Sequence, residues 1–155
     1  MRPIPAETLA ELKGRTFAFG DVNSTSSHIV PRAMLLEAGV PVELLGSFDH
    51  LGHHDAVAAA VLRGDYDAGA VMESVAAQYE AEGLMTLAQS PPIPEFNICA
   101  ARELPGDVKE TLSRALLALT LDGGAGTAVL ETLYADYAGI RAMMQKLGLL
   151  GETVR

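Results

Sequence analysis

The sequence predicts an α/β fold in which a mostly parallel sheet is flanked by helices. Short apolar runs typical of strands alternate with longer stretches whose apolar residues recur at helical spacing. Several of the longer stretches end at a glycine, the residue that most readily closes a helix. Apolar residues make up 49% of the 155 positions, which is enough for a hydrophobic core. Alternation of this kind favours parallel strands joined by helices.

The expected strands are short apolar runs, and the first of them is the clearest. Thr16–Phe19 (TFAF) places Phe17 and Phe19 on one side of an extended chain, as in a buried strand. The other strands expected within the first ninety residues are Val42–Leu45, Ala68–Met72 and Leu84–Ala88. The helices expected around them are residues 6–13 before Gly14, His28–Ala38 before Gly39, Asp55–Arg63 before Gly64, and Glu73–Glu82.

Residues Ser90–Pro94 (SPPIP) interrupt the alternation. Three prolines within four positions enforce an extended backbone and cannot join a central strand. We therefore expect residues 1–90 to form an α/β lobe, residues 91–95 a hinge, and residues 96–155 a C-terminal part that belongs to a second lobe. The elements expected in that part are a strand at Phe96–Ala101, a long helix at Asp107–Leu121, a helix capped by Thr127 and a weaker helix within IRAMMQKLGLL.

The most informative motif is GDVNSTSSHIVP at residues 20–31, between the first strand and the helix after it. It gathers side-chain donors at a helix start, namely those of Asn23, Ser24, Thr25, Ser26 and Ser27. A helix N-terminus presents unpaired N–H groups and the positive end of the macrodipole, so added hydroxyls suit a phosphate-like or carboxylate anion. One of these serines can serve simply as the N-cap, but a cap needs only one such residue. The run therefore predicts an anion pocket in the lobe of residues 1–90.

His54 is the second candidate for anion contact. It opens the Ala/Val-rich helix, so its ring lies beside a second helix N-terminus. A neutral imidazole donates one N–H, and a protonated one donates two and adds a charge. Either form can hold an anion from the side opposite the serine run.

Other interpretations of the histidines stay open at this point. One is a metal site formed by His50, His53, His54 and Asp55. Another is a hydrolase triad of Ser24, His54 and Asp67, although no nucleophile elbow of the G-x-S-x-G type is present. The plainest interpretation makes loop and cap residues of His28, His50 and His53.

Three ordered segments resemble the phosphonate/phosphate-type substrate-binding proteins of ABC transporters. FAFGDVNSTSSHIVPRAMLLEAG is similar to the family's strand–STS–helix segment, and GHHDAVAAAVLRGDYDAGAV to its Gly-x-His-Asp helix with the strand after it. LAQSPPIPEFNICAARELP resembles the segment in which the chain recrosses the hinge. Together the three segments lie within residues 12–133. The resemblance implies a type-2 periplasmic-binding-protein-like fold, incomplete relative to a two-lobed member because the first half of lobe one has no counterpart here.

The resemblance also implies a function. It predicts binding of a phosphonate-, phosphate- or phosphite-like oxyanion as the substrate-binding component of an ABC transporter, with a permease as partner and no enzymatic activity. It assigns ligand contact to Asn23, Ser24, Thr25, Ser26 and His54. Ser27 and His28 replace the Gly-aromatic pair more usual after STS, and Met72 stands where many members have an acidic residue, which favours a simple oxyanion over an amine. A sensory or interaction domain and a small metal- or Ser-dependent hydrolase remain the alternatives.

Composition argues against several other classes of partner. The net charge of −9 disfavours nucleic acid and anionic membrane surfaces. Cys99 is the only cysteine, which excludes an internal disulfide and a cysteine-based metal cluster. No stretch is long and apolar enough for direct membrane insertion, and no cofactor is expected.

Location and assembly follow from the resemblance in the same way. The family is periplasmic, but MRPIPAETLAELKG lacks the apolar core of a signal peptide, so this sequence predicts a cytoplasmic protein if it is full length. The apolar faces around Phe96–Ala101 and Val108–Leu119 would pack on the unmatched half of lobe one. We therefore expect a homo-oligomer or a separate partner lobe to cover them.

Overall fold

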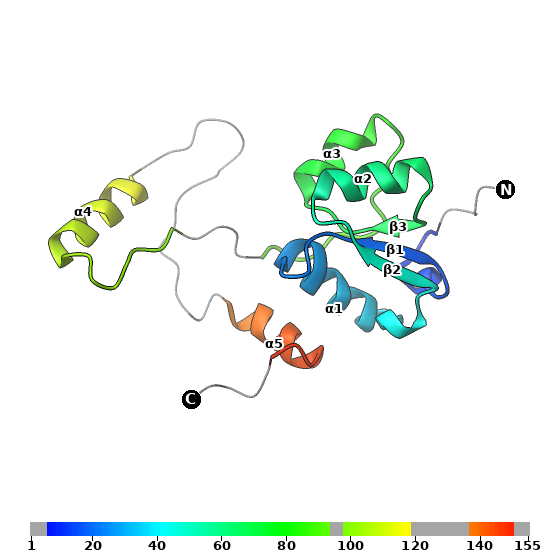
Figure 1. The fold of residues 1–155 in the computed structure, drawn as a ribbon, viewed down its shortest axis with the longest axis horizontal. Coiled ribbons are helices and arrows are strands. Elements are labelled where there is room, and N and C mark those ends of the chain that lie inside the picture. Colours follow the sequence, from blue (N-terminus) through cyan, green and yellow to red (C-terminus); the bar gives the residue numbers. More distant parts are fainter. Residues whose placement is uncertain (1–5, 94–97, 119–136, 151–155) are drawn as a thin grey trace. The chain divides into compact units, whose positions relative to one another are not determined.

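The structure, a computed structural model, describes residues 6–93, 98–118 and 137–150 (Figure 1). The described residues up to Ile93 and from Gly139 onward form one compact unit, and those between Ile98 and Ala138 form a second. None of the helices within these ranges has the length and apolar character that a membrane crossing requires. The first unit contains η1 (Leu9–Leu12), β1 (Thr16–Phe19), η2 (Thr25–Ile29), α1 (Val30–Glu37), η3 (Val42–Leu44), β2 (Ser47–His50), α2 (His54–Arg63), β3 (Ala68–Gly69), α3 (Glu73–Glu80) and nearly all of α5 (Ala138–Lys146). The second contains α4 (Gly106–Leu117).

Strand β1 lies at the centre of a parallel three-stranded sheet with the order β2–β1–β3. Phe17 of β1 pairs with Phe48 on one side and with Ala68 on the other. Parallel strands point their C-terminal ends to the same edge of a sheet, so the segments that lead into η2, α2 and α3 all leave from that edge (Figure 1).

The two faces of β1 are buried by different helices. Phe17 and Phe19 belong to a core cluster that includes Leu35 of α1, while Ala18 and Val57 of α2 are also fully buried. Helix α1 covers one face of the sheet, and α2 and α3 cover the other (Figure 1). Strand β1 is buried on both faces, as is usual for the central strand of a parallel sheet.

A glycine lets α2 approach the sheet closely. A methyl group added at Gly69 would lie 2.5 Å from Cγ1 of Val57 and 3.0 Å from the carbonyl oxygen of Ala18. Neither neighbour has room to move, because Val57 is buried against β1 and the carbonyl belongs to the ladder between β1 and β3.

The α/β class with a parallel sheet is confirmed, and so are the strand at Thr16–Phe19 and the helices that begin near His28, Asp55, Glu73 and Asp107. The helix expected over residues 6–13 forms only the short 3-10 turn η1, and the strand expected at Ala68–Met72 ends at Gly69. The tail contains the expected helix, α5. The end of the long helix beyond Ala118 and the helix capped by Thr127 lie outside the described residues.

Two expected strands are wrong, and the described part of a third, Phe96–Ala101, contains no strand. Val42–Leu45 forms the 3-10 turn η3, and the neighbouring strand starts at Ser47 instead. Its sequence, SFDH, is not an apolar run because all four residues are exposed at the edge of the sheet. Leu84–Ala88 and residues 98–101 contain no strand, because neither segment has a neighbouring strand among the described residues to accept its backbone hydrogen bonds. The division into a lobe, a hinge at residues 91–95 and a second lobe stays a prediction.

The close packing at Gly69 gives a test of the fold. We expect Gly69→Ala to lower the free energy of unfolding by about 1–3 kcal/mol, because the methyl group overpacks the contact between α2 and β1. Gly139→Ala in α5 is the matched control, since its methyl group meets no described atom within 4 Å. Urea unfolding followed by circular dichroism measures both variants. Equal effects of the two substitutions would contradict this description of the packing.

Candidate functional site

Three helix starts gather at the C-terminal edge of the sheet. The amide of Leu51, just after β2, donates to the carbonyl oxygen of Phe19 at 2.9 Å. The amide of Ala70, just after β3, donates to the carbonyl oxygen of Ala18 at 3.0 Å. These bonds hold the segments before α2 and α3 directly beside the end of β1. An edge of this kind is where open parallel sheets bind their ligands.

The loop after β1 is shaped by Gly20 and Asp21. Oδ1 of Asp21 accepts the amide of Asn23 at 2.8 Å, which forms a tight Asx turn. The amide of Gly20 donates to the carbonyl oxygen of Ser27 at 3.1 Å, and a Cβ atom at Gly20 would overlap the buried hydroxyl of Ser27. Glycine therefore allows the loop to fold back onto the helix that it opens.

Ser24, Thr25 and Ser26 lie half-buried at this helix start, and the side chain of Asn23 is exposed beside them. The expectation that Ser27 joins them is wrong, because its side chain is fully buried beneath Gly20. Ser24 is the N-cap, because its Oγ accepts the amide of Ser27 at 3.1 Å. A hydroxyl that accepts in this way still has its own proton to donate. The backbone amides of Thr25 and Ser26 belong to the first turn of the helix, so they have no helical carbonyl oxygen to donate to. The cap interpretation is thus correct for one serine. The hydroxyls of Ser24 and Ser26 lie 3.5 Å apart, so one of them can donate to the other, and the Thr25 hydroxyl and one serine proton remain.

The helix opens with a π turn before it becomes regular. The amide of Ile29 donates to the carbonyl oxygen of Ser24 at 3.1 Å, five residues back, and α1 continues from Val30. A π turn widens the first coil of the helix, and such turns occur frequently at functional sites.

His54 is the first residue of α2, and its ring orientation is fixed by a neighbouring helix start. The amide of Met72, at the N-cap of α3, donates to Nδ1 of His54 at 3.0 Å. An amide only donates, so Nδ1 is unprotonated and the neutral ring carries its proton at Nε2. Burial lowers the pKa of His54 below its usual 6.5, and His53 adds to this effect while Asp55 opposes it. His54 is therefore a neutral donor at pH 7.

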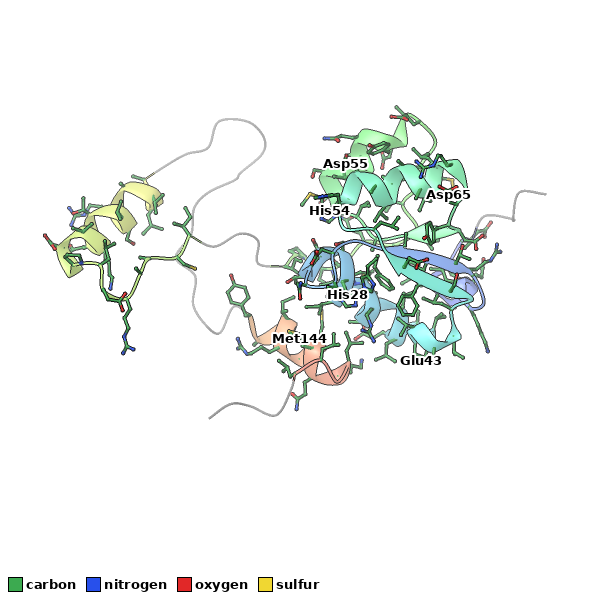
Figure 2. The ribbon with its side chains drawn as sticks, in the orientation of Figure 1. His28, Glu43, His54, Asp55, Asp65 and Met144 are labelled. Carbon is green, nitrogen blue, oxygen red and sulfur yellow. The ribbon has the colours of Figure 1, made fainter. Side chains whose placement is uncertain are left out.

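The structure brings the predicted site residues to the same edge of the sheet. The serine run follows β1, and His54 follows the adjacent strand β2. The two connecting loops also lie close together, since the carbonyl oxygen of Gly52 is 3.5 Å from the Cβ position of Gly20. Figure 2 shows His54 at the start of α2 and His28 in the neighbouring helical segment. His53 is the N-cap of α2 but provides no side-chain cap bond, which leaves the first amides of that helix without a side-chain acceptor.

The ligands of the alternative metal site are used in other ways. The ring of His50 stacks on Phe19 with a centroid distance of 5.5 Å, and Nδ1 of His54 already accepts the Met72 amide. Within the described ranges, no group of three or more His, Cys, Asp or Glu side chains is arranged to hold a metal ion.

The alternative hydrolase triad is not assembled. Oδ2 of Asp67 accepts the backbone N–H of Thr16 at 2.8 Å and its hydroxyl at 2.9 Å. Thr16 begins β1, whereas Ser24 follows its end, so Asp67 and Ser24 lie at opposite edges of the sheet. Burial by itself would raise the pKa of Asp67, but the bonds from Thr16 and the charge of Arg15 outweigh it and lower the pKa. Asp67 is a structural anion that ties β1 to the loop before β3.

The interpretation of the other histidines as loop and cap residues is correct for His53 and wrong for the other two. His50 ends β2, and His28 is a buried residue of η2 whose ring touches Phe19 and His50. Sequence reasoning also missed the contact between His28 and Arg32. Their spacing of four residues on a helix was the signal that could have revealed it.

Comparison with known proteins identifies the family. The family model for ABC transporter phosphonate periplasmic substrate-binding proteins matches residues 3–146. The chain belongs to this family. A relative within it, the probable ABC transporter phosphite binding protein PhnD1 of Prochlorococcus marinus (strain MIT 9301), is 39% identical over 69 residues. That alignment covers 43% of this chain and 23% of the relative.

A solved member of the family has the same fold. The 1.52 Å resolution structure of PhnD1 from Prochlorococcus marinus (MIT 9301) in complex with methylphosphonate matches with a TM-score of 0.77 at 23% sequence identity. The match covers 97% of this chain and 63% of that chain. It confirms the periplasmic-binding-protein-like fold, and it shows that this chain spans less than two thirds of the length of the solved relative.

The state of the His54 ring gives a prediction that does not depend on a ligand. We expect ring ¹⁵N chemical shifts to report the Nε2–H tautomer and a pKa below 6.5, with the His54 signals assigned by their loss in His54→Gln. The folded pKa of His54 lies below its unfolded value. The contribution of His54 to the free energy of unfolding is therefore complete above pH 6.5 and is lost as the pH falls from 6.5 through the folded pKa. An Nδ1–H tautomer would contradict the bond from Met72.

Proposed function

We propose that this chain binds a phosphonate-, phosphate- or phosphite-like oxyanion at the C-terminal edge of its sheet, as the substrate-binding component of an ABC transporter. The observation that carries the proposal is the meeting of two helix starts with outward donors. One supplies the hydroxyls of Ser24, Thr25 and Ser26 with the backbone amides of Thr25 and Ser26, and the other supplies Nε2–H of His54. The PhnD1 relatives, a probable phosphite binding protein and a structure in complex with methylphosphonate, bind anions of the class that such donors suit.

The net charge of −9 is compatible with anion binding. Charges more than about 10 Å away are largely screened at physiological ionic strength, whereas helix amides and hydroxyls act at contact distance. Oδ1 of Asp21, the carboxylate closest in sequence to the serine run, is engaged by the amide of Asn23. Recognition by neutral donors selects a ligand by its shape and protonation state more than by its charge.

The same site favours a simple oxyanion over an amine-bearing ligand. Met72 stands where an acidic side chain would be needed to recognise an ammonium group, and its backbone amide is committed to His54. The proposal therefore places phosphate, phosphite and alkylphosphonates above aminophosphonates.

The wider role follows from the family. Its members are substrate-binding components of transporters, which supports an extracytoplasmic, non-catalytic protein that delivers its ligand to a permease. Residues 91–95 then serve as the hinge about which two lobes close on the ligand.

Isothermal titration tests the proposal. Phosphate, phosphite, methylphosphonate and 2-aminoethylphosphonate are titrated into the protein at pH 7.5, with sulfate as a tetrahedral anion that carries no proton. The proposal expects heat with at least one of the first three ligands and weaker binding of the aminophosphonate and of sulfate. Absence of heat with all five would contradict it.

Thr25→Val tests the serine run without disturbing the helix cap. The two side chains have the same shape, and among the described residues the Thr25 hydroxyl has no hydrogen-bond partner that would be lost. Removal of one charge-assisted bond of about 1.5–3 kcal/mol should weaken oxyanion binding about 10- to 150-fold. Ser24→Ala should weaken binding too, but it also removes the N-cap at a cost of about 1 kcal/mol in stability. Thr111→Val on α4 is the control, and equal affinity of both Val variants would exclude Thr25 from the site.

Self-association is a further part of the proposal. Helix α4 exposes Val108, Leu112 and Leu117, although its sequence was expected to pack an apolar face. We infer that a second copy of the chain covers this face. Sedimentation equilibrium should therefore give a mass above 16.3 kDa, and Leu112→Glu should reduce it. A monomer at all concentrations would count against this assembly.

A further inference from the structure

His28 is buried directly after the serine run, and no ligand contact is assigned to it. Only 5% of its surface is exposed. Its Nδ1 lies 2.6 Å from the carbonyl oxygen of Val22, and its Nε2 lies 3.4 Å from Nη1 of Arg32. Val22 belongs to the loop that leads into the serine run, and Arg32 lies one turn further along the helix. One side chain thus ties the loop to the helix that the loop opens.

The two partners determine where the proton of His28 lies. A carbonyl oxygen only accepts, so Nδ1 must carry a hydrogen. A guanidinium only donates and does not lose its proton in proteins, so Nε2 must be unprotonated. The neutral Nδ1–H ring satisfies both partners. A protonated ring would turn Nε2–H toward an N–H of Arg32 and place two positive charges side by side.

The charged and titratable groups around His28 come from three segments. Arg32 lies on α1, His50 on β2 with a ring-centroid distance of 4.6 Å, and Asp21 in the loop before η2. Burial is the strongest influence and lowers the pKa of His28 below 6.5; His50 and Arg32 add to this, while the Val22 bond and Asp21 oppose it. The environment as a whole keeps the ring neutral at pH 7.

We propose that His28 is a positioning residue whose neutral ring holds Val22 through Nδ1–H, and so keeps the donors of Ser24–Ser26 directed at the anion. Its effect on affinity rests on the proposed anion site. Its hold on the loop is a property of the protein without ligand. Removal of the Nδ1–H donor should therefore loosen the loop and weaken anion binding, and a side chain that restores this donor should restore both.

Two substitutions separate the two hydrogen bonds. The side-chain amide of His28→Asn can still donate near the position of Nδ1 but cannot gain a proton. His28→Gln reaches toward the position of Nε2 and can accept from Arg32, but it offers no donor to Val22. His53→Asn is the control, because the His53 side chain is exposed and makes no cap bond.

Amide hydrogen exchange without ligand is the first readout. At pH 7.5 we expect exchange of residues 22–27 to rise about tenfold in His28→Gln and to stay near the wild-type rate in His28→Asn and His53→Asn. Unchanged loop exchange in His28→Gln would overturn the proposal. If that variant does not fold, ring ¹⁵N chemical shifts of His28 in the wild type that report an Nε2–H tautomer would overturn it.

Calorimetry with methylphosphonate at pH 7.5 is the second readout. Because the ligand titrates identically with every variant, differences between variants report the protein alone. We expect His28→Gln to bind about tenfold more weakly than the wild type, and His28→Asn, which restores the donor to Val22, to bind with nearly the wild-type affinity. Equal affinities in all variants would overturn the positioning role. If the wild type binds neither this anion nor phosphate or phosphite but the loop responds as expected, the proposed function fails and the hold of His28 on Val22 stands.

Discussion

The pairing of β1 on both of its edges is the constraint on which the rest of the structure depends. With β2 on one side and β3 on the other, β1 has no free edge, and both of its faces must be covered by helices. Phe17 and Phe19 turn to the α1 face, and Ala18 leaves room for α2. Because all three strands are parallel, this same pairing delivers three helix starts to one edge of the sheet. The position of the candidate site therefore follows from the strand order, and the side chains at that edge supply its chemistry.

The chemistry of this edge depends on neutral groups whose protons are fixed by partners. The Met72 amide leaves His54 with Nε2–H, and Val22 with Arg32 leaves His28 with Nδ1–H. Burial holds the pKa of both rings below the usual value. A site built from helix amides, hydroxyls and neutral imidazole can attract an oxyanion in a chain whose net charge is strongly negative.

Much of the fold and part of the site could be predicted from the sequence, for identifiable reasons. The TFAF strand and the serine-rich helix start carry their signals locally, in alternation and in capping chemistry, and the structure confirms both elements. Strand β2 was missed because SFDH is an exposed edge strand that pairs only through β1, and Leu84–Ala88 was predicted as a strand because an apolar run does not reveal whether it has a partner. The roles of Asp67 and His28 could not be read from the sequence, since each depends on a contact made only after the chain folds. The ligand-contact roles of Asn23, Ser24, Thr25, Ser26 and His54 stay predictions.

The most direct test of the central claim is a map of backbone amide chemical shifts during titration with methylphosphonate. Two-dimensional ¹H–¹⁵N spectra resolve each amide, so they report where the anion binds as well as whether it binds. We expect the largest changes on Thr25 and Ser26 at one helix start and on Asp55 and Ala56 at the other. Saturable changes confined to other parts of the chain would contradict the claim that these two helix starts form the anion site.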